Sequence, residues 1–248
     1  MKILSIGNSF STDAQKWLNQ IAKSAGADIY CANLYIGGCS LERHWNNFIC
    51  GEEAYDYEIN GVFERRISVN EALCKEEWDV ITLQQVSGLS GIFSSFEPYL
   101  TNLIAEVKTA CPNARLLLHK TWAYEIGSEH PDFKNYGCSQ KKMFEEITKA
   151  YCEAAEKTGL KIIPAGDTIQ HLRENVKEFD LENGGISLTR DSFHLSYDYG
   201  RFAAGLVWLK VLTGKSAKDA DFVPEVEGPT TDARILDIIK SAVDEIIY

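Results

Sequence analysis

The chain has 248 residues, a formal net charge of −11, an apolar fraction of 45% and a charged fraction of 25%. A chain of this composition can bury a substantial core, which argues against intrinsic disorder. Because nucleic-acid binding depends on clustered Lys and Arg side chains, the acidic balance argues against a nucleic-acid partner. The length suits a single α/β domain, which we expect to span residues 1–248.

The cysteines indicate the compartment. Seven of them are scattered without a C-x-x-C pair, and an odd number of unpaired thiols is typical of a reducing environment. The first residues do not resemble a secretory signal, and no apolar run is long enough to cross a membrane. The sequence therefore predicts a cytoplasmic protein without a membrane partner, and it leaves the oligomeric state open.

The chain begins with a predicted buried strand that stops at Gly7-Asn8-Ser9 and enters a helix over about residues 12–25, with Ser11-Thr12-Asp13 as capping residues. A second strand over residues 28–36 stops in the same way at Gly37-Gly38. In open α/β sheets, ligands bind at the carboxyl ends of the strands. We therefore expect both loops at the functional edge of the sheet.

The middle of the chain begins with a predicted β-hairpin over residues 55–68, because Asn60-Gly61 lies between alternating apolar and polar residues. A short helix over residues 69–76 and a strand over residues 78–83 follow. This strand ends in the polar cluster Gln84-Gln85-Val86-Ser87. It is the third buried strand that ends in small or polar residues.

The second half continues the alternation of helices and strands. Helices are predicted over residues 96–110, 139–158 and 200–212, strands over 115–119 and 161–163, and a final helix that Gly228-Pro229 opens. Between them lie a long aromatic-rich loop over residues 120–137 and a loop over residues 184–199. Such alternation predicts a parallel sheet covered by helices on both faces.

Ser9 and the pair Asp191 and His194 form a candidate catalytic set. A serine hydroxyl is a weak nucleophile, so it needs a base such as His194, whose tautomer Asp191 would fix. A D-x-x-H pattern is common, however, and two structural interpretations compete with it. Ser9 could simply cap the following helix, and His194 could brace a loop.

Four segments in order resemble the conserved blocks of the SGNH/GDSL hydrolases. They are Gly7-Asn8-Ser9-Phe10-Ser11, Gly37-Gly38-Cys39-Ser40-Leu41, Leu83-Gln84-Gln85-Val86-Ser87 and Asp191-Ser192-Phe193-His194. The chain is most similar to the bacterial subgroup with Gly-Asn-Ser-Phe in place of Gly-Asp-Ser-Leu, the DUF4886-like proteins. This resemblance implies a flavodoxin-like three-layer α/β/α sandwich. It also implies serine esterase chemistry with Ser9 as nucleophile, His194 as base and Asp191 as its partner.

The resemblance also implies an oxyanion hole made of the serine amide, a second-block glycine amide and a third-block side chain. Ser9 and Gly38 match the first two donors. The family's usual Gly-x-Asn-Asp is absent from the third block, so we expect Gln84 to be the third donor, with Gln85 and Ser87 as alternatives. Loss of one such donor in a serine protease costs about 10²–10³ in turnover.

The expected function is therefore that of a serine esterase that removes a small acyl group, with acetyl as the first choice, from a carbohydrate or similar polar ester. Several aromatic side chains either stack on the sugar ring or pack beneath loops, namely His44, Trp45, Trp122, Tyr124 and Tyr136. The alternative function is a non-catalytic flavodoxin-like module that binds a nucleotide or phosphate at residues 7–12. Neither a metal nor a cofactor is expected, because the remaining histidines lack the spacing of zinc ligands.

Overall fold

A single sheet organises the molecule, which is described here from a computed structural model of residues 1–227 and 231–247. The sheet has seven strands in the order β4-β3-β2-β1-β5-β6-β7. The strands are β1 (Lys2–Gly7), β2 (Tyr30–Tyr35), β3 (Tyr55–Ile59), β4 (Val62–Ile67), β5 (Val80–Leu83), β6 (Arg115–His119) and β7 (Lys161–Ile163).

Most of the sheet is parallel. β1 pairs in parallel with β2 and with β5, and β6 pairs in parallel with β5 and with β7. These strands have the order 2-1-3-4-5 among themselves, which is that of flavodoxin-like folds. β3 and β4 form a hairpin around Asn60 and Gly61, and β3 pairs antiparallel with β2. The hairpin therefore extends the sheet, which is mixed at this edge.

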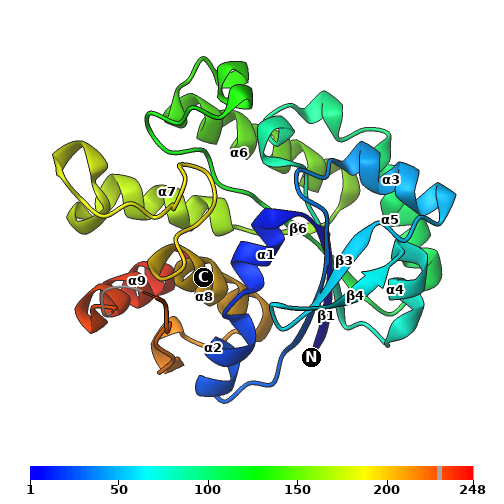
Figure 1. Ribbon diagram of the computed structural model, residues 1–248, viewed down its shortest axis with the longest axis horizontal. Coiled ribbons are helices and arrows are strands. Elements are labelled where there is room, and N and C mark those ends of the chain that lie inside the picture. The colour runs from blue at the N-terminus through cyan, green and yellow to red at the C-terminus, as the bar shows by residue number, and fades with distance from the viewer. Residues whose placement is uncertain (228–230, 248) are drawn as a thin grey trace.

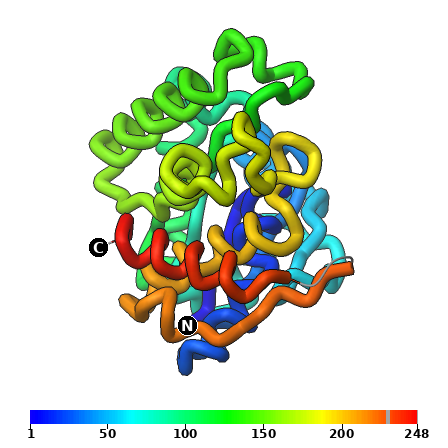
Figure 2. The backbone as a smooth tube through the Cα atoms, turned by 90° about the vertical axis from the view of Figure 1, so that its left-hand side faces the viewer, coloured from blue at the N-terminus to red at the C-terminus, as the bar shows by residue number. Residues whose placement is uncertain are grey.

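Helices cover both faces of the sheet. In Figure 1, α3, α4 and α5 lie on one side of the strands, and α1, α2, α7, α8 and α9 lie on the other. Figure 2 shows α9 on the outside of the molecule, where it packs on α8. The helices are α1 (Ser9–Gln15), α2 (Leu18–Ser24), α3 (Leu41–Cys50), α4 (Val69–Lys75), α5 (Tyr99–Ala110), α6 (Gln140–Thr158), α7 (Ala165–Asn175), α8 (Tyr199–Thr213) and α9 (Ala233–Ile246).

Short 3₁₀ turns lie in the connections between these elements. They are η1 (Ser87–Leu89), η2 (Phe93–Ser95), η3 (Pro131–Tyr136), η4 (Lys177–Phe179), η5 (Leu181–Asn183) and η6 (Ala217–Asp219). The expected three-layer α/β/α fold with a central, mainly parallel sheet is confirmed. In this fold the carboxyl ends of β1, β2 and β5 meet at one edge, so the first three sequence blocks lie close together.

Two helix predictions differ from the structure. The helix expected over residues 12–25 is divided into α1 and α2, and α1 already begins at Ser9 because Asn8 and Ser11 form a reciprocal capping box. The final helix begins at Ala233, where the Asp232 side chain caps it. The expected helix start at Gly228 and Pro229 lies outside the described residues.

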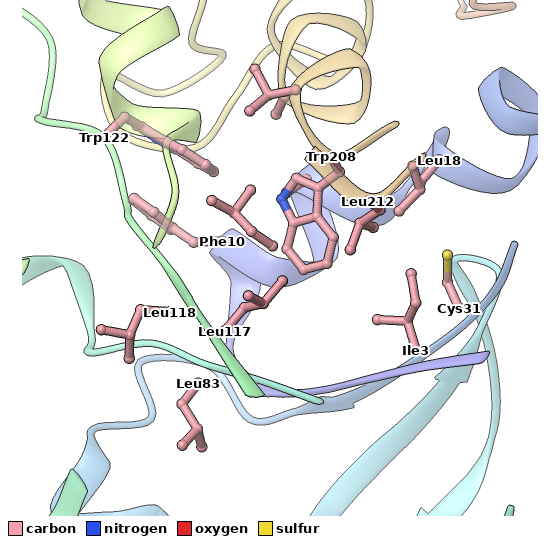
Figure 3. Packing of buried hydrophobic residues seen from close by; sticks show 14 of the residues in the cluster. Ile3, Phe10, Leu18, Cys31, Leu83, Leu117, Leu118, Trp122, Trp208 and Leu212 are labelled. Carbon is pink, nitrogen blue, oxygen red and sulfur yellow. The ribbon is translucent and has the colours of Figure 1, made fainter. Parts of the chain in front are cut away.

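The core on the α8 side of the sheet is built from large aromatic side chains. Every residue from Tyr199 to Leu209 in α8 is buried, because this helix packs against the sheet and is flanked by α1, α2, α7 and α9. A helix that is apolar around its whole circumference is buried in this way. Figure 3 shows Phe10, Trp122 and Trp208 on this side of the strands, whereas Leu83 points to the other side.

Candidate active site

Ser9 lies where β1 meets α1. The Asn8 side chain accepts a hydrogen bond from the Phe10 amide at 3.0 Å, and Ser11 Oγ accepts one from the Asn8 amide at 3.1 Å. The turn also depends on Gly7, since a Cβ at that position would lie 2.2 Å from Ser11 Oγ. These contacts fix Ser9 as the first residue of α1, with its side chain in a cleft at the edge of the sheet.

The loop before α8 brings His194 and Asp191 to this serine. His194 Nε2 lies 2.8 Å from Ser9 Oγ, and His194 Nδ1 lies 2.7 Å from Asp191 Oδ2. An ionised carboxylate can only accept hydrogen bonds, so Nδ1 carries the proton and Nε2 accepts from the Ser9 hydroxyl. The structure therefore places all three predicted triad residues in one connected set with the geometry of a serine–histidine–aspartate triad.

A tight turn and its hydrogen bonds hold Asp191 in its charged form. Ser192 has a left-handed φ of 72°, an uncommon conformation for a non-glycine residue. Asp191 Oδ1 accepts from the amide of His194 at 2.7 Å and from that of Phe193 at 3.3 Å. Partial burial acts to raise the pKa of Asp191, but the hydrogen bonds from the side chain and backbone of His194 outweigh it and lower the pKa below its ordinary value. The carboxylate is thus available to stabilise an imidazolium.

Asp13, one turn beyond Ser9, anchors this loop. Its buried carboxylate accepts from the Leu195 amide at 2.9 Å, from Arg190 Nη1 at 3.0 Å and from Arg201 Nε at 2.8 Å. Arg190 and Leu195 flank the segment that carries Asp191 and His194, and Arg201 belongs to α8. The interpretation of Asp13 as a capping residue is therefore wrong: Asp13 ties the serine helix to the histidine loop.

Ser9 and Gly38, the two residues expected to supply oxyanion-hole amides, line the same cleft. Gly38 follows β2 and has a φ of +62°. Across residues 1–227 and 231–247, neither amide donates to another backbone or side-chain acceptor. Asn8 joins the two loops, because its Nδ2 donates to the Cys39 carbonyl at 3.1 Å.

Gln84 takes a different position from the one expected of a third donor. Its Nε2 donates to Asn8 Oδ1 at 2.8 Å, its Oε1 accepts from His119 Nδ1 at 2.7 Å, and the residue does not line the cleft. Burial lowers the pKa of His119 to about 3, so its ring is neutral and donates through Nδ1. This geometry does not support Gln84 as the third donor, because the residue does not line the cleft and one of its amide protons is donated to Asn8.

The two alternative third-block residues also differ from each other. Both ends of the Gln85 side-chain amide already form hydrogen bonds within the protein. Its Oε1 accepts from the Leu41 amide at 3.0 Å, and its Nε2 donates to the Ser95 carbonyl at 2.9 Å. Ser87 lines the cleft, with its Oγ 2.9 Å from the Tyr124 hydroxyl. Of the three third-block residues considered, Ser87 alone reaches the cleft.

The cleft has a volume of about 540 Å³ and is bordered by the ends of β1 and β2, by η1 and η3, and by the loop before α8. Its aromatic and imidazole walls are Tyr35, His130 and Phe193, together with Phe10 and His194. None of these is among the side chains considered for sugar stacking. Tyr35 lies near the end of the predicted strand over residues 28–36, His130 lies in the long aromatic-rich loop and Phe193 precedes His194. Their positions in or beside predicted loops were the sequence signal that could have placed them in the cleft.

The aromatic residues considered for stacking pack inside the protein instead. His44, Trp122, Tyr124 and Tyr136 are buried, and half-buried Trp45 stacks on Phe48. Trp122 stacks on Phe10 with ring centroids 4.2 Å apart, and its Nε1 donates to the Phe193 carbonyl at 2.8 Å. The packing interpretation is therefore the correct one. Trp122 links the residue after Ser9 to the residue before His194.

Within residues 1–227 and 231–247, no three His, Cys, Asp or Glu side chains are grouped so that they could hold a metal ion. Among the helices described, none combines the length and the apolar character needed to cross a membrane.

The fold defines the class of protein. It matches a candidate SGNH hydrolase from Slackia heliotrinireducens with a TM-score of 0.58 and 20% identity, over 86% of this chain and 98% of that one. It also matches an acetyl xylan esterase with a TM-score of 0.54 and 15% identity, over 86% of this chain and 99% of that one. The fold is that of the SGNH hydrolases, as expected from the four sequence blocks.

The family follows from two closer matches. A model described as a domain of unknown function, DUF4886, matches residues 2–243. A DUF4886 family protein from Bacteroides uniformis is 34% identical, with a TM-score of 0.89 over 100% of this chain and 94% of that chain. The chain belongs to the DUF4886 family. No curated protein matches it.

Proposed function

We propose that this protein is a serine esterase that removes a small acyl group, acetyl in the first instance, from a carbohydrate or similar polar alcohol. The observation that carries the proposal is the continuous contact from Ser9 Oγ through the His194 ring to Asp191. The choice of acetyl draws support from the fold shared with an acetyl xylan esterase. The alternative of a phosphate-binding module has weaker support, because the described residues that line the cleft include no Lys or Arg.

In the proposed reaction, Ser9 Oγ attacks the ester carbonyl carbon while His194 Nε2 takes the hydroxyl proton. The carbonyl oxygen becomes an oxyanion, which the amides of Ser9 and Gly38 stabilise. When the carbon–oxygen bond to the alcohol breaks, His194 returns its proton to the leaving oxygen. Water then attacks the acyl-enzyme while His194 takes its proton. When the bond from the acyl carbon to Ser9 Oγ breaks, His194 returns this proton to Ser9 Oγ, and the acid is released.

The test compares wild type with Ser9→Ala on p-nitrophenyl acetate, on longer acyl esters and on a panel of acetylated sugars. Because the nucleophile is lost, we expect kcat to fall by about 10⁴ or more in Ser9→Ala. Ser40→Ala is a matched control: Ser40 lines the same cleft without contacting His194, although it caps α3.

The control variant should retain activity within about threefold, with the loss confined to stability because a helix cap is worth about 1 kcal/mol. Wild type that hydrolyses none of the esters would refute the proposal. Equal activity in wild type and Ser9→Ala would also refute it, and a preference for long acyl chains would refute the choice of acetyl.

A further inference from the structure

We propose, on the basis of the esterase function above, that Asp132 selects the alcohol part of the ester. Its carboxylate accepts hydrogen bonds from an uncharged, polyhydroxylated alcohol and repels an alcohol that carries a negative charge. This residue lies outside the triad and the oxyanion hole, and no block of the sequence resemblance contains it.

Asp132 is held at the wall of the cleft by its neighbours. It lies in the first turn of η3, and its amide donates to His130 Nδ1 at 3.2 Å. Its carboxylate packs against Gly88 in η1, where a Cβ would come within 2.2 Å of Asp132 Oδ2. Asp132 and His130 line the same cleft as Ser9 and His194. A group attached to the ester oxygen can therefore reach this carboxylate.

The carboxylate is available to a substrate. In the part of the chain that the structure describes, Asp132 Oδ1 and Oδ2 accept no hydrogen bond and take part in no ion pair, although the residue is half-buried. An ionised carboxylate offers about four acceptor positions and no donor. Hydroxyl groups of a polyol can satisfy these positions in place of water, whereas an anionic group cannot.

The surrounding charge strengthens this selection. The described residues lining the cleft include no Lys or Arg, so a negative charge on the substrate would face Asp132 without a compensating cation. The whole chain has a net charge of −11, which adds to the repulsion. The polar wall of the cleft also includes the hydroxyl groups of Tyr35 and Ser87. Such a wall suits the hydroxyl groups of a neutral alcohol.

The experiment uses two acetate esters of nearly equal shape, 4-acetoxybenzamide and 4-acetoxybenzoate, which differ in the charge on the leaving group. We expect wild type to prefer the neutral ester by about tenfold in kcat/KM, beyond the difference in their uncatalysed hydrolysis. Asp132→Asn should reduce this preference to about twofold, because it keeps the shape and removes the charge. Asp132→Ser, which is smaller, provides a second variant with the same expectation.

Glu129→Gln is the matched control, since Glu129 is an exposed carboxylate in the same loop that does not line the cleft. It should leave the preference unchanged. Asp132→Ser should also raise KM for acetylated monosaccharides about fivefold, because the carboxylate that accepts their hydroxyl groups is lost, whereas Glu129→Gln should leave this KM unchanged.

The outcomes separate the two proposals. If wild type hydrolyses both esters in a Ser9-dependent way and both Asp132 variants keep the wild-type preference, the inference about Asp132 is wrong and the esterase function stands. A Glu129→Gln variant that loses the preference equally would also overturn it, in favour of a general charge effect. If no ester is hydrolysed, the esterase function fails and the inference fails with it.

Discussion

His194 uses both of its ring nitrogens, so its protonation decides whether Ser9 can react. A proton on Nε2 removes the lone pair that accepts the serine hydroxyl, so kcat/KM should fall as the pH is lowered. The pKa of Asp191 lies below its ordinary value, so this carboxylate stays ionised in mildly acidic solution. A single proton is therefore responsible for the loss.

We expect log kcat/KM for p-nitrophenyl acetate to fall with a slope of about one on the acid side, because one group titrates. Activity falls toward low pH because His194 acts as a base only when it is deprotonated. Asp191, whose pKa is lowered, is already ionised. A profile measured with a stability check at each pH provides the test. A flat profile, or a slope of two, would contradict this assignment of the base.

At the same scale, Gln84 shows where sequence reasoning reached its limit. The resemblance indicated a block that borders the cleft through Ser87, because a buried strand ending in polar residues is a local pattern. It did not reveal that Gln84 lies between Asn8 and His119, at 2.8 Å and 2.7 Å, since these contacts join β1, β5 and β6. Which way an amide points depends on such long-range partners.

At the scale of elements, the buried carboxylate of Asp13 joins α1 to α8 and to the loop that carries Asp191 and His194. Asp13→Asn keeps the shape but leaves two arginines without their anionic partner, which should cost about 3 kcal/mol of unfolding free energy. We also expect kcat to fall about tenfold or more, because the loop that carries His194 is no longer fixed. Denaturant unfolding and ester hydrolysis measure the two effects.

Asp237→Asn provides the control for Asp13→Asn, because that carboxylate is 76% exposed on α9 and forms an ion pair with Lys240 in the same helix. It should change the unfolding free energy by less than about 1 kcal/mol and leave kcat unchanged. Full activity in Asp13→Asn, at a temperature where the variant is folded, would show that the position of the Asp191–His194 loop does not depend on the Asp13 carboxylate.

The contrast between the triad and Asp13 explains how much of the site the sequence could predict. Ser9, Asp191 and His194 carry reactive groups in short motifs at predicted loops, and the resemblance of four segments to the SGNH/GDSL blocks distinguished them from other residues of the same types. Asp13 is a common residue in a helix, and its partners are Arg190 and Arg201, far along the chain. The division of the first helix at Lys16 and Trp17 was also missed. Both side chains donate to carbonyls of distant segments, those of Gly61 and Tyr197, which a local pattern does not reveal.

At the scale of the whole molecule, the aromatic core both stabilises the fold and contacts the loop that carries His194. Two buried tryptophans differ in this respect, since one contacts that loop and the other does not. Trp122 stacks on Phe10 and donates to the Phe193 carbonyl at 2.8 Å. Trp208 lies in α8 against the sheet, and its Nε1 has no hydrogen-bond partner among the described residues. Both side chains are fully buried, so replacing either with Phe leaves a comparable cavity.

Trp208→Phe should lower the unfolding free energy by about 1–2 kcal/mol through that cavity alone and leave kcat within about twofold, because no hydrogen bond is lost. Trp122→Phe should cost about 1 kcal/mol more, since the Phe193 carbonyl loses its donor, and kcat should fall about tenfold as the His194 loop loosens. Thermal unfolding and ester hydrolysis of the two variants side by side provide the measurement. Equal effects of both changes on kcat would mean that the core supports the fold as a whole without a specific connection to the catalytic loop.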